Sequence, residues 1–192
     1  MAQALAGLIL GGGAGERFGG PKAFARLPGG ATFAERCLAT LRSAGADPVA
    51  ATLPPDASGR LPAGLEALRL PASGMDMLAS LRHGLAHLLE TPGWSVVVVL
   101  PVDHPLVGPD AVRALAAAAA PTAVPVYRGK RGHPVALTRE FAERLASGES
   151  PAANLRDAMK AAGRRDVEVD DPGVVGNCNT PELLATALAR QR

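Results

Sequence analysis

The chain has 192 residues, of which 47% are hydrophobic and only 3% aromatic, and its formal net charge is +2. This length suits one core, so we expect residues 1–192 to form a single domain, and the charge is too small to predict a nucleic-acid partner. No apolar run approaches the roughly 18 to 20 residues that span a bilayer, and the two cysteines lack a C-x-x-C spacing, so we expect no membrane partner and a reduced, cytoplasmic setting.

The chain starts with a short apolar run, residues 5–10, that predicts a buried strand, and a glycine-rich loop follows it up to Lys22. Glycines let backbone N–H groups close around anionic oxygens, and Arg17 and Lys22 add positive charge. This loop predicts a nucleoside triphosphate site. It matches neither the dinucleotide-binding pattern, because Phe18 stands at the third glycine position, nor the P-loop pattern. The alternative is a glycine-rich turn with two solvated cations.

Strand and helix patterns alternate through most of the remaining chain. Helices are predicted from Thr32 as N-cap up to Gly45, over 77–89, from Pro109 to about Ala120, and over 139–146, 151–162 and 181–190. Strands are predicted over 49–53, 65–70, 96–100, 123–127, 133–137 and 166–169, with 123–127 and 133–137 joined into a hairpin by the basic turn 128–132. The alternation predicts an α/β fold, with a mainly parallel sheet and helices on both faces.

The clearest strand is residues 96–100, four valines and a leucine, which predicts a central parallel strand buried on both faces. Asp103 follows it between two prolines, at the same carboxyl edge of the sheet as the glycine loop, and ligands bind at this edge in such sheets. Mg²⁺ prefers one or two carboxylates together with water and substrate phosphate, so Asp103 is the first choice of magnesium ligand. The alternative is an aspartate that caps the turn before Pro109.

A second polar segment precedes the last predicted helix, where Thr180 is the expected N-cap and Pro181 the first helical residue. Asn179 is a candidate second magnesium ligand through its amide oxygen, with Asp170 and Asp171 as competitors. His133 is a candidate substrate contact, and so is His104; a histidine beside proline is otherwise a turn residue.

Four motifs together resemble the molybdenum-cofactor nucleotidyltransferase family, whose members include molybdopterin cytidylyltransferases and guanylyltransferases. They are L-x-x-G-x-G-x-R-x-G-x-P-K, V-D-x-P, R-G-H-P-V and N-x-N-T-P-E-L, spread over almost the full length. The resemblance implies a three-layer, Rossmann-like nucleotidyltransferase fold. It implies catalysis by Arg17, Lys22 and Asp103, magnesium bound by Asp103 and Asn179, and nucleotide binding by Leu10, Gly11, Gly12, Gly13, Gly15, Arg17, Lys22, Gly74 and Ser80.

The implied reaction transfers a nucleotidyl group from CTP or GTP to a phosphate-bearing acceptor, with molybdopterin as the leading acceptor, Mg²⁺ as cofactor and a molybdoenzyme as the expected recipient of the product. The choice of base stays open. The Pro21-Lys22 ending and the segment 131–134 look like the cytidylyl branch, whereas the segment 177–180 is closer to the guanylyl branch. The alternatives are a sugar- or alcohol-phosphate nucleotidyltransferase and a non-catalytic nucleotide-binding accessory protein. The accessory role is suggested by Asn179, where several relatives carry aspartate.

Overall fold

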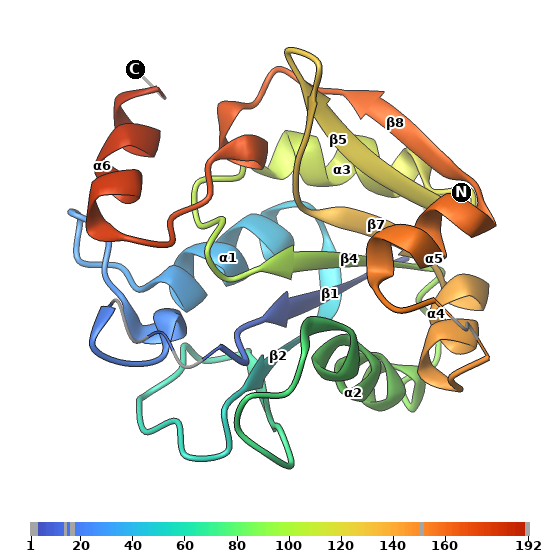
Figure 1. The fold of residues 1–192 in the computed structure, drawn as a ribbon, viewed down its shortest axis with the longest axis horizontal. Helices are drawn as coiled ribbons and strands as arrows, with labels where there is room; N and C mark the ends of the chain where they lie inside the picture. Colours follow the sequence, from blue (N-terminus) through green and yellow to red (C-terminus); the bar gives the residue numbers. More distant parts are fainter. Residues whose placement is uncertain (1–3, 14, 16–17, 150–151, 191–192) are drawn as a thin grey trace.

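Strands and helices alternate along the computed structural model, which describes residues 4–13, 15, 18–149 and 152–190 (Figure 1). The strands are β1 (Leu5–Leu10), β2 (Ala46–Leu53), β3 (Glu66–Arg69), β4 (Val96–Pro101), β5 (Thr122–Tyr127), β6 (Lys130–Arg131), β7 (Val135–Thr138) and β8 (Arg164–Glu168). The helices are α1 (Phe33–Ser43), α2 (Met77–Leu89), α3 (Pro109–Ala118), α4 (Arg139–Ala146), α5 (Leu155–Ala162) and α6 (Pro181–Ala189), with short 3-10 helices η2 (Lys22–Phe24) and η3 (Pro172–Val175).

These strands form one sheet in the order β3-β2-β1-β4-β7-β5-β6, and β8 pairs with β5 beside this path. β1 is parallel to both β2 and β4, and the pairs β2–β3 and β5–β8 are also parallel. β7 runs antiparallel to both of its neighbours, β4 and β5. The predicted α/β fold with a mainly parallel sheet is confirmed.

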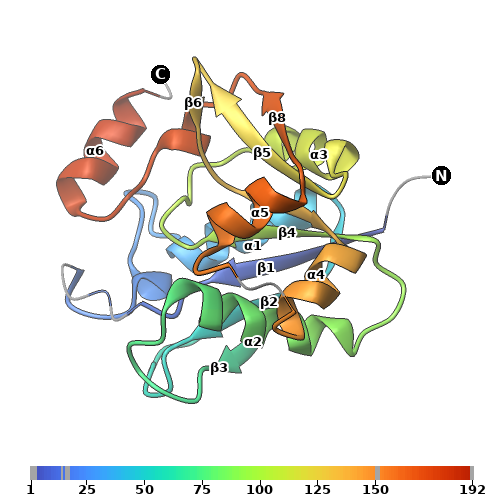
Figure 2. The same cartoon turned by 45° about the vertical axis from the view of Figure 1, so that its right-hand side comes forward.

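Helices cover both faces of the sheet, as predicted, with α1 and α3 on one face and α2, α4 and α5 on the other (Figure 2). Strand β4 serves both layers, because successive residues of a strand point to opposite faces. Val96, Val98 and Leu100 pack with the α1 and α3 side, whereas Val97 and Val99 pack with the α2 and α4 side. The valine run is therefore central and buried on both faces, but it is parallel only to β1 and not to β7.

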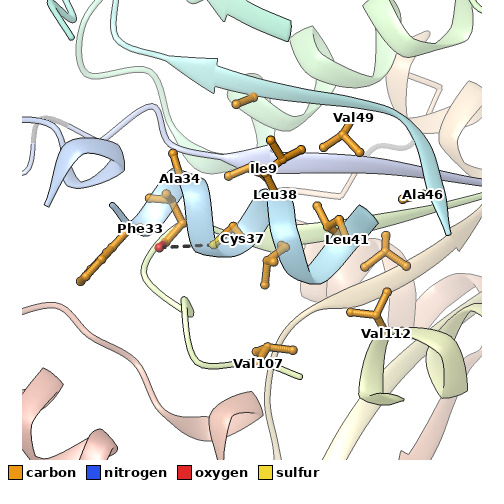
Figure 3. Close-up of a cluster of buried hydrophobic side chains, with 14 of the residues drawn as sticks. Ile9, Phe33, Ala34, Cys37, Leu38, Leu41, Ala46, Val49, Val107 and Val112 are labelled. Atoms are coloured by element: carbon orange, nitrogen blue, oxygen red, sulfur yellow. Dashed lines mark hydrogen bonds between the residues drawn. The ribbon is translucent and has the colours of Figure 1, made fainter. Parts of the chain in front are cut away.

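Helix α1 shows how local signals set an element. Thr32 caps its first turn in a capping box with Glu35, and Gly45 follows its end with φ +92°, a conformation that favours glycine. Its buried face, which includes Phe33, Cys37 and Leu41, packs against Ile9 and Val49 of β1 and β2, and against Val107 and Val112 from the loop before α3 and from α3 itself (Figure 3). No helix in the described part of the chain is both long and apolar enough to cross a membrane.

The predicted hairpin differs from the structure in its turn. The turn contains only Arg128 and Gly129, because Lys130 and Arg131 form β6 against the end of β5. The returning strand β7 begins at Val135 and pairs with the opposite end of β5. Its start is delayed because the backbone N–H of His133 donates instead to the carbonyl of Val174, 2.8 Å away in η3.

Several further boundaries differ from the predictions: β2 begins at Ala46 instead of residue 49, and α3 ends at Ala118 instead of about Ala120. Helix α5 begins at Leu155, and the described residues before it, 152–154, are not helical, because Asn154 is extended and its side chain accepts the N–H of Asp157 as an N-cap. Strand β8 covers 164–168 instead of 166–169, in register with β5 from Thr122 to Val126. The division into a single domain and the cytoplasmic location stay predictions.

Candidate active site

The glycine loop and Asp103 leave the sheet at the same edge. Leu10 and Pro101, the last residues of β1 and β4, pair in register, so the segments that follow them are neighbours. A cavity of about 250 Å³ lies there, which we call the loop cavity. Of the predicted nucleotide, catalytic and metal residues, Leu10, Gly11, Gly12, Gly13, Lys22, Ser80 and Asp103 line this cavity, whereas Gly15, Gly74 and Asn179 do not.

Lys22 contacts two polar side chains from distant parts of the chain. Its Nζ lies 3.2 Å from Oδ2 of Asp103 and also donates to Oδ1 of Asn179. Both charged side chains are largely covered, with exposed fractions of 22% for Lys22 and 19% for Asp103. The early cation and the acid in the middle of the chain therefore face the same space, as the sequence predicts.

The position of Asn179 follows from a backbone bond. The N–H of Cys178 donates to the carbonyl of Asp103 over 2.8 Å, which ties the segment before α6 to the end of β4. Burial, together with the nearby Asp103 carboxylate, raises the pKa of the Cys178 thiol to about 11, and the same two causes raise the pKa of Cys37. Both sulfurs are therefore protonated at neutral pH, and neither is suited to act as a nucleophile.

The glycines at the start of the loop differ in what surrounds them. A Cβ at Gly11 would lie 2.9 Å from the carbonyl oxygen of Thr52, and one at Gly12 would overlap the side chain of Leu70. At Gly13 a Cβ would meet no described residue within 4 Å, apart from its neighbours in the chain. Gly11 and Gly12 therefore allow close packing, whereas Gly13 leaves open space at the cavity wall.

Gly15 has a different task, which is to fold the loop back. Its φ is +67°, and its carbonyl accepts the N–H groups of Phe18 and Gly20. This turn directs the chain towards η2, which begins at Lys22. Arg17, the other predicted cation of the loop, lies outside the described residues.

Ser80 and Gly74 differ in their burial. Ser80 is 5% exposed and projects from the first turns of α2, where Asp76 caps the helix by accepting the N–H of Ala79. Gly74 is exposed, has φ +75° and stands in the connection between β3 and α2. Ser80 therefore lies within helix α2 and lines the loop cavity, and the roles of both residues stay predictions.

The carboxylate of Asp171 has a structural role, which is to accept two backbone hydrogen bonds. Its two oxygens accept the N–H groups of Gly108 and Gly173, each over 2.8 Å. The turn before Pro109 is therefore capped by Asp171, whereas the carboxylate of Asp103 bonds Lys22. Asp170 is exposed, and among the described residues no group of three or more His, Cys, Asp or Glu side chains could hold a metal.

The rings of His104 and His133 pack edge to face, and His104 lies next to Asp103. Their ring centroids are 5.1 Å apart, and Nε2 of His104 is 4.0 Å from Oδ1 of Asp103. Burial and the neighbouring His104 lower the pKa of His133 to about 4, and burial also lowers the pKa of His104. Nδ1 of His133 is buried without a hydrogen-bond partner in the described part of the chain. Both imidazoles are therefore neutral at physiological pH.

His133 lines a second, larger cavity of about 720 Å³, between the sheet and helices α2 and α5, which we call the arginine cavity. Three arginines line it: Arg131, Arg156 and Arg164. Met77 lines both cavities, so the two spaces are neighbours. Sequence reasoning missed this site, apart from His133, because its arginines come from three separate elements and belong to no common motif.

Comparison with solved structures gives the same fold with low sequence identity. Rv0371c from Mycobacterium tuberculosis H37Rv aligns with a TM-score of 0.79 and 24% identity over 98% of this chain and 99% of that chain. A manganese complex of Rv0371c aligns with a TM-score of 0.71 and 22% identity, over 97% and 98%.

Two further solved structures have names that describe an enzyme or a biosynthetic protein. A 2-C-methyl-D-erythritol 4-phosphate cytidylyltransferase from Thermus thermophilus aligns with a TM-score of 0.65 and 25% identity, over 99% of this chain and 98% of that chain. A molybdopterin-guanine dinucleotide biosynthesis protein A from Archaeoglobus fulgidus aligns with a TM-score of 0.65 and 17% identity, over 97% and 100%.

Comparison with the curated proteins finds no match. A family model does match: it is that of the MobA-like NTP transferase domain, and it covers residues 7–167. This range contains the glycine loop, Lys22, Asp103 and His133. The chain therefore belongs to the family of MobA-like NTP transferase domains, whose members carry out nucleotidyl transfer.

Proposed function

We propose that this protein transfers a nucleoside monophosphate group from CTP or GTP to a phosphate-bearing acceptor, with molybdopterin as the leading acceptor, and releases pyrophosphate. The observation that carries the proposal is the meeting of Lys22 and Asp103, 81 residues apart in sequence, within 3.2 Å beside a glycine-lined cavity. The name of the Archaeoglobus structure supports the pterin acceptor. A molybdoenzyme would then receive the product, in the cytoplasm.

The residues beside Lys22 also fit a divalent cation. Asp103 and Asn179 already direct one oxygen each at a single positive group, the Lys22 ammonium. A carboxylate and an amide oxygen are hard ligands of the kind that Mg²⁺ takes, and the manganese complex of Rv0371c supports a divalent metal. When bound, the ion would neutralise charge on the phosphate oxygens.

The protein's own contribution is alignment and charge. We propose that Lys22 turns from Asp103 to the triphosphate when the nucleotide binds, and that Arg17 supplies a second cation from the loop. A phosphate oxygen of the acceptor attacks the α-phosphorus, a new P–O bond forms, and the bond to the β-phosphate oxygen breaks, so pyrophosphate leaves. No covalent enzyme intermediate is needed. Preorganised cations stabilise the charge that develops on the leaving group.

The proposal is tested by incubating the protein with each of the four nucleoside triphosphates, Mg²⁺ and a panel of phosphate acceptors, with pyrophosphate release as the readout. The panel contains molybdopterin, a sugar phosphate and methylerythritol phosphate, the substrate in the name of the Thermus structure. We expect release with CTP or GTP and molybdopterin. Pyrophosphate release only with a sugar or alcohol phosphate would show that the acceptor is that phosphate and not molybdopterin. Nucleotide binding without release in any combination would favour an accessory role.

A matched pair of variants tests the proposed role of the Asp103 carboxylate. Asp103→Asn removes the charge that faces Lys22 and should lower kcat by about a hundredfold or more. Asp170→Asn makes the same chemical change at an exposed aspartate and should leave kcat unchanged. Equal rates for the two variants would remove Asp103 from the mechanism.

A further inference from the structure

The arginine cavity carries more positive charge than its own carboxylates neutralise. Arg131 and Arg164 share one partner, Asp166. Arg156 makes no ion pair or hydrogen bond with any described residue. The one carboxylate in the lining, that of Asp76, is engaged in capping α2. The cavity wall is therefore suited to an anionic ligand.

The backbone of one of these arginines, Arg164, lies far from the expected reaction centre. Val97, Leu137, Thr122 and Arg164 pair in one row across β4, β7, β5 and β8. The loop cavity lies at the row of Pro101, four residues further along β4. At about 3.3 Å per residue, the Arg164 backbone lies about 13 Å down the sheet from that edge. Neither Lys22 nor Asp103 lines the arginine cavity, and neither Arg156 nor Arg164 lines the loop cavity. An anion bound by these two arginines would therefore occupy a separate space from the reacting phosphate.

We infer that the acceptor carries a second anionic group, a carboxylate or a phosphate, which Arg156 and Arg164 bind at a distance from the phosphate that reacts. This inference rests on the proposed nucleotidyl transfer, and if it holds, molybdopterin, which carries one phosphate and no carboxylate, is not the acceptor. Between the two ends, the cavity wall is apolar, with Leu78, Val124, Val135 and Met159. The acceptor class is therefore an elongated molecule with an apolar or flat body and an anionic group at each end.

Asp166 acts in this arrangement as a positioning residue. Arg131 uses Nε and Nη2 on Asp166, whereas Arg164 uses only Nε. Within the described part of the chain, both terminal nitrogens of Arg164 are thus left for a ligand, while its Nε is held by Asp166. A guanidinium with two parallel N–H groups matches a carboxylate or phosphate in a bidentate contact.

Calorimetry with fructose 1,6-bisphosphate and fructose 6-phosphate as probes, without nucleotide, tests the site. The two sugars differ in one phosphate, so their affinity ratio reports a contact with the second anion. We expect the bisphosphate to bind about tenfold or more tightly to the wild-type protein, because a charge-assisted contact of this kind is worth at least that factor. Arg156→Ala and Arg164→Ala should each reduce the ratio, and the double variant should abolish it.

Arg165→Ala is the matched control, because Arg165 is exposed, follows Arg164 on β8 and does not line the cavity. It should retain the wild-type ratio. Thermal melting of each variant separates loss of binding from loss of folding. A ratio near one in the wild-type protein, or a ratio that survives the double variant, would overturn the inference.

Kinetics distinguish this inference from the proposed function. If pyrophosphate is released with an acceptor but Arg156→Ala leaves its KM unchanged, the two-ended acceptor is wrong and the transferase assignment stands. If no acceptor supports release but the bisphosphate preference still depends on Arg156, the anion site stands and the assignment of a transferase fails. Where both hold, Arg156→Ala should raise the KM of the acceptor about tenfold without changing the KM of the nucleoside triphosphate.

Discussion

The two cavities are built in different ways. The loop cavity lies where the parallel strands β1 and β4 end together, and it is lined largely by a glycine loop and the residues that follow the valine strand. The arginine cavity takes its three arginines from β6, the start of α5 and the start of β8, around the antiparallel part of the sheet. The first site is thus set by strand ends close to two motifs, whereas the second depends on how distant elements pack.

This difference matches the division of labour that we propose. A triphosphate is the same for every nucleotidyltransferase, so its site can be a regular feature of the fold. Acceptors differ between such enzymes, and their site is assembled from elements whose side chains are free to vary. Four experiments would break or sharpen this contrast.

Lys22→Ala should have the largest effect, because it removes the cation that faces Asp103 and Asn179. We expect kcat to fall by about 10² to 10³, the loss typical when one preorganised charge or donor is removed from a transition state. Lys130→Ala, at an exposed lysine of β6, is the control and should retain the wild-type rate. An unchanged rate in Lys22→Ala with an intact fold would remove Lys22 from the mechanism.

The pH dependence of stability should be the next largest effect, and it reports on the wall of the arginine cavity. The pKa of His133 falls from 6.5 to about 4 in the folded state, because of burial, the adjacent His104 and Arg156, opposed by Asp103. Below pH 6.5 the unfolded chain therefore takes up a proton that the folded protein refuses, so stability is present above this pH and is lost as pH falls towards 4. The loss amounts to about 3 kcal/mol.

Urea unfolding of the wild-type protein and of His133→Gln between pH 7 and pH 4 measures this contribution. We expect the pH slope of the unfolding free energy to be clearly smaller in His133→Gln. A residual slope should remain, because burial also lowers the pKa of His104. Identical slopes in the two proteins would show that His133 is solvated, and the cavity wall would then differ from the one described.

The same contrast explains which features could be predicted from the sequence. The strand before the glycine loop, the valine strand and the N-cap Thr32 are local patterns, and the structure has each of them where the pattern indicates. The start of β7 could not be predicted, because it depends on the carbonyl of Val174, 41 residues away from His133, which takes the N–H that would have continued the strand.

The candidate site divides in the same way. The proximity of Lys22 and Asp103 follows from strand ends that meet at one edge, so two predicted strands of a mainly parallel sheet are enough to predict it. The role of Asp171 as the acceptor for Gly108 and Gly173 was not predicted, since nothing in the sequence relates Asp171 to a turn 63 residues earlier. The arginine pair around Asp166 likewise depends on the pairing of β5 with both β6 and β8.

Asp171→Ala should lower stability by about 2 kcal/mol, because two partly buried backbone N–H groups lose their acceptor. Asp170→Ala changes the neighbouring, exposed carboxylate and should cost less than about 0.5 kcal/mol. Denaturant unfolding measures both. The apparent affinity for Mg²⁺ should be the same in the two variants, and a selective loss in Asp171→Ala would move the metal site away from Asp103.

Gly13→Ala should have the smallest effect and is the most selective test of the loop cavity. A Cβ at Gly13 would contact none of the described residues beyond its chain neighbours, and the φ of Gly13 is not positive, so the melting temperature should change little. The added methyl group would lie at the cavity wall, where it would obstruct the close approach of phosphate oxygens to the backbone. We expect the KM of the triphosphate to rise about tenfold, with the KM of the acceptor unchanged. Because Gly20 stands outside the cavity lining and is equally open, Gly20→Ala is the control, and equal KM values in the two variants would show that the triphosphate does not lie against Gly13.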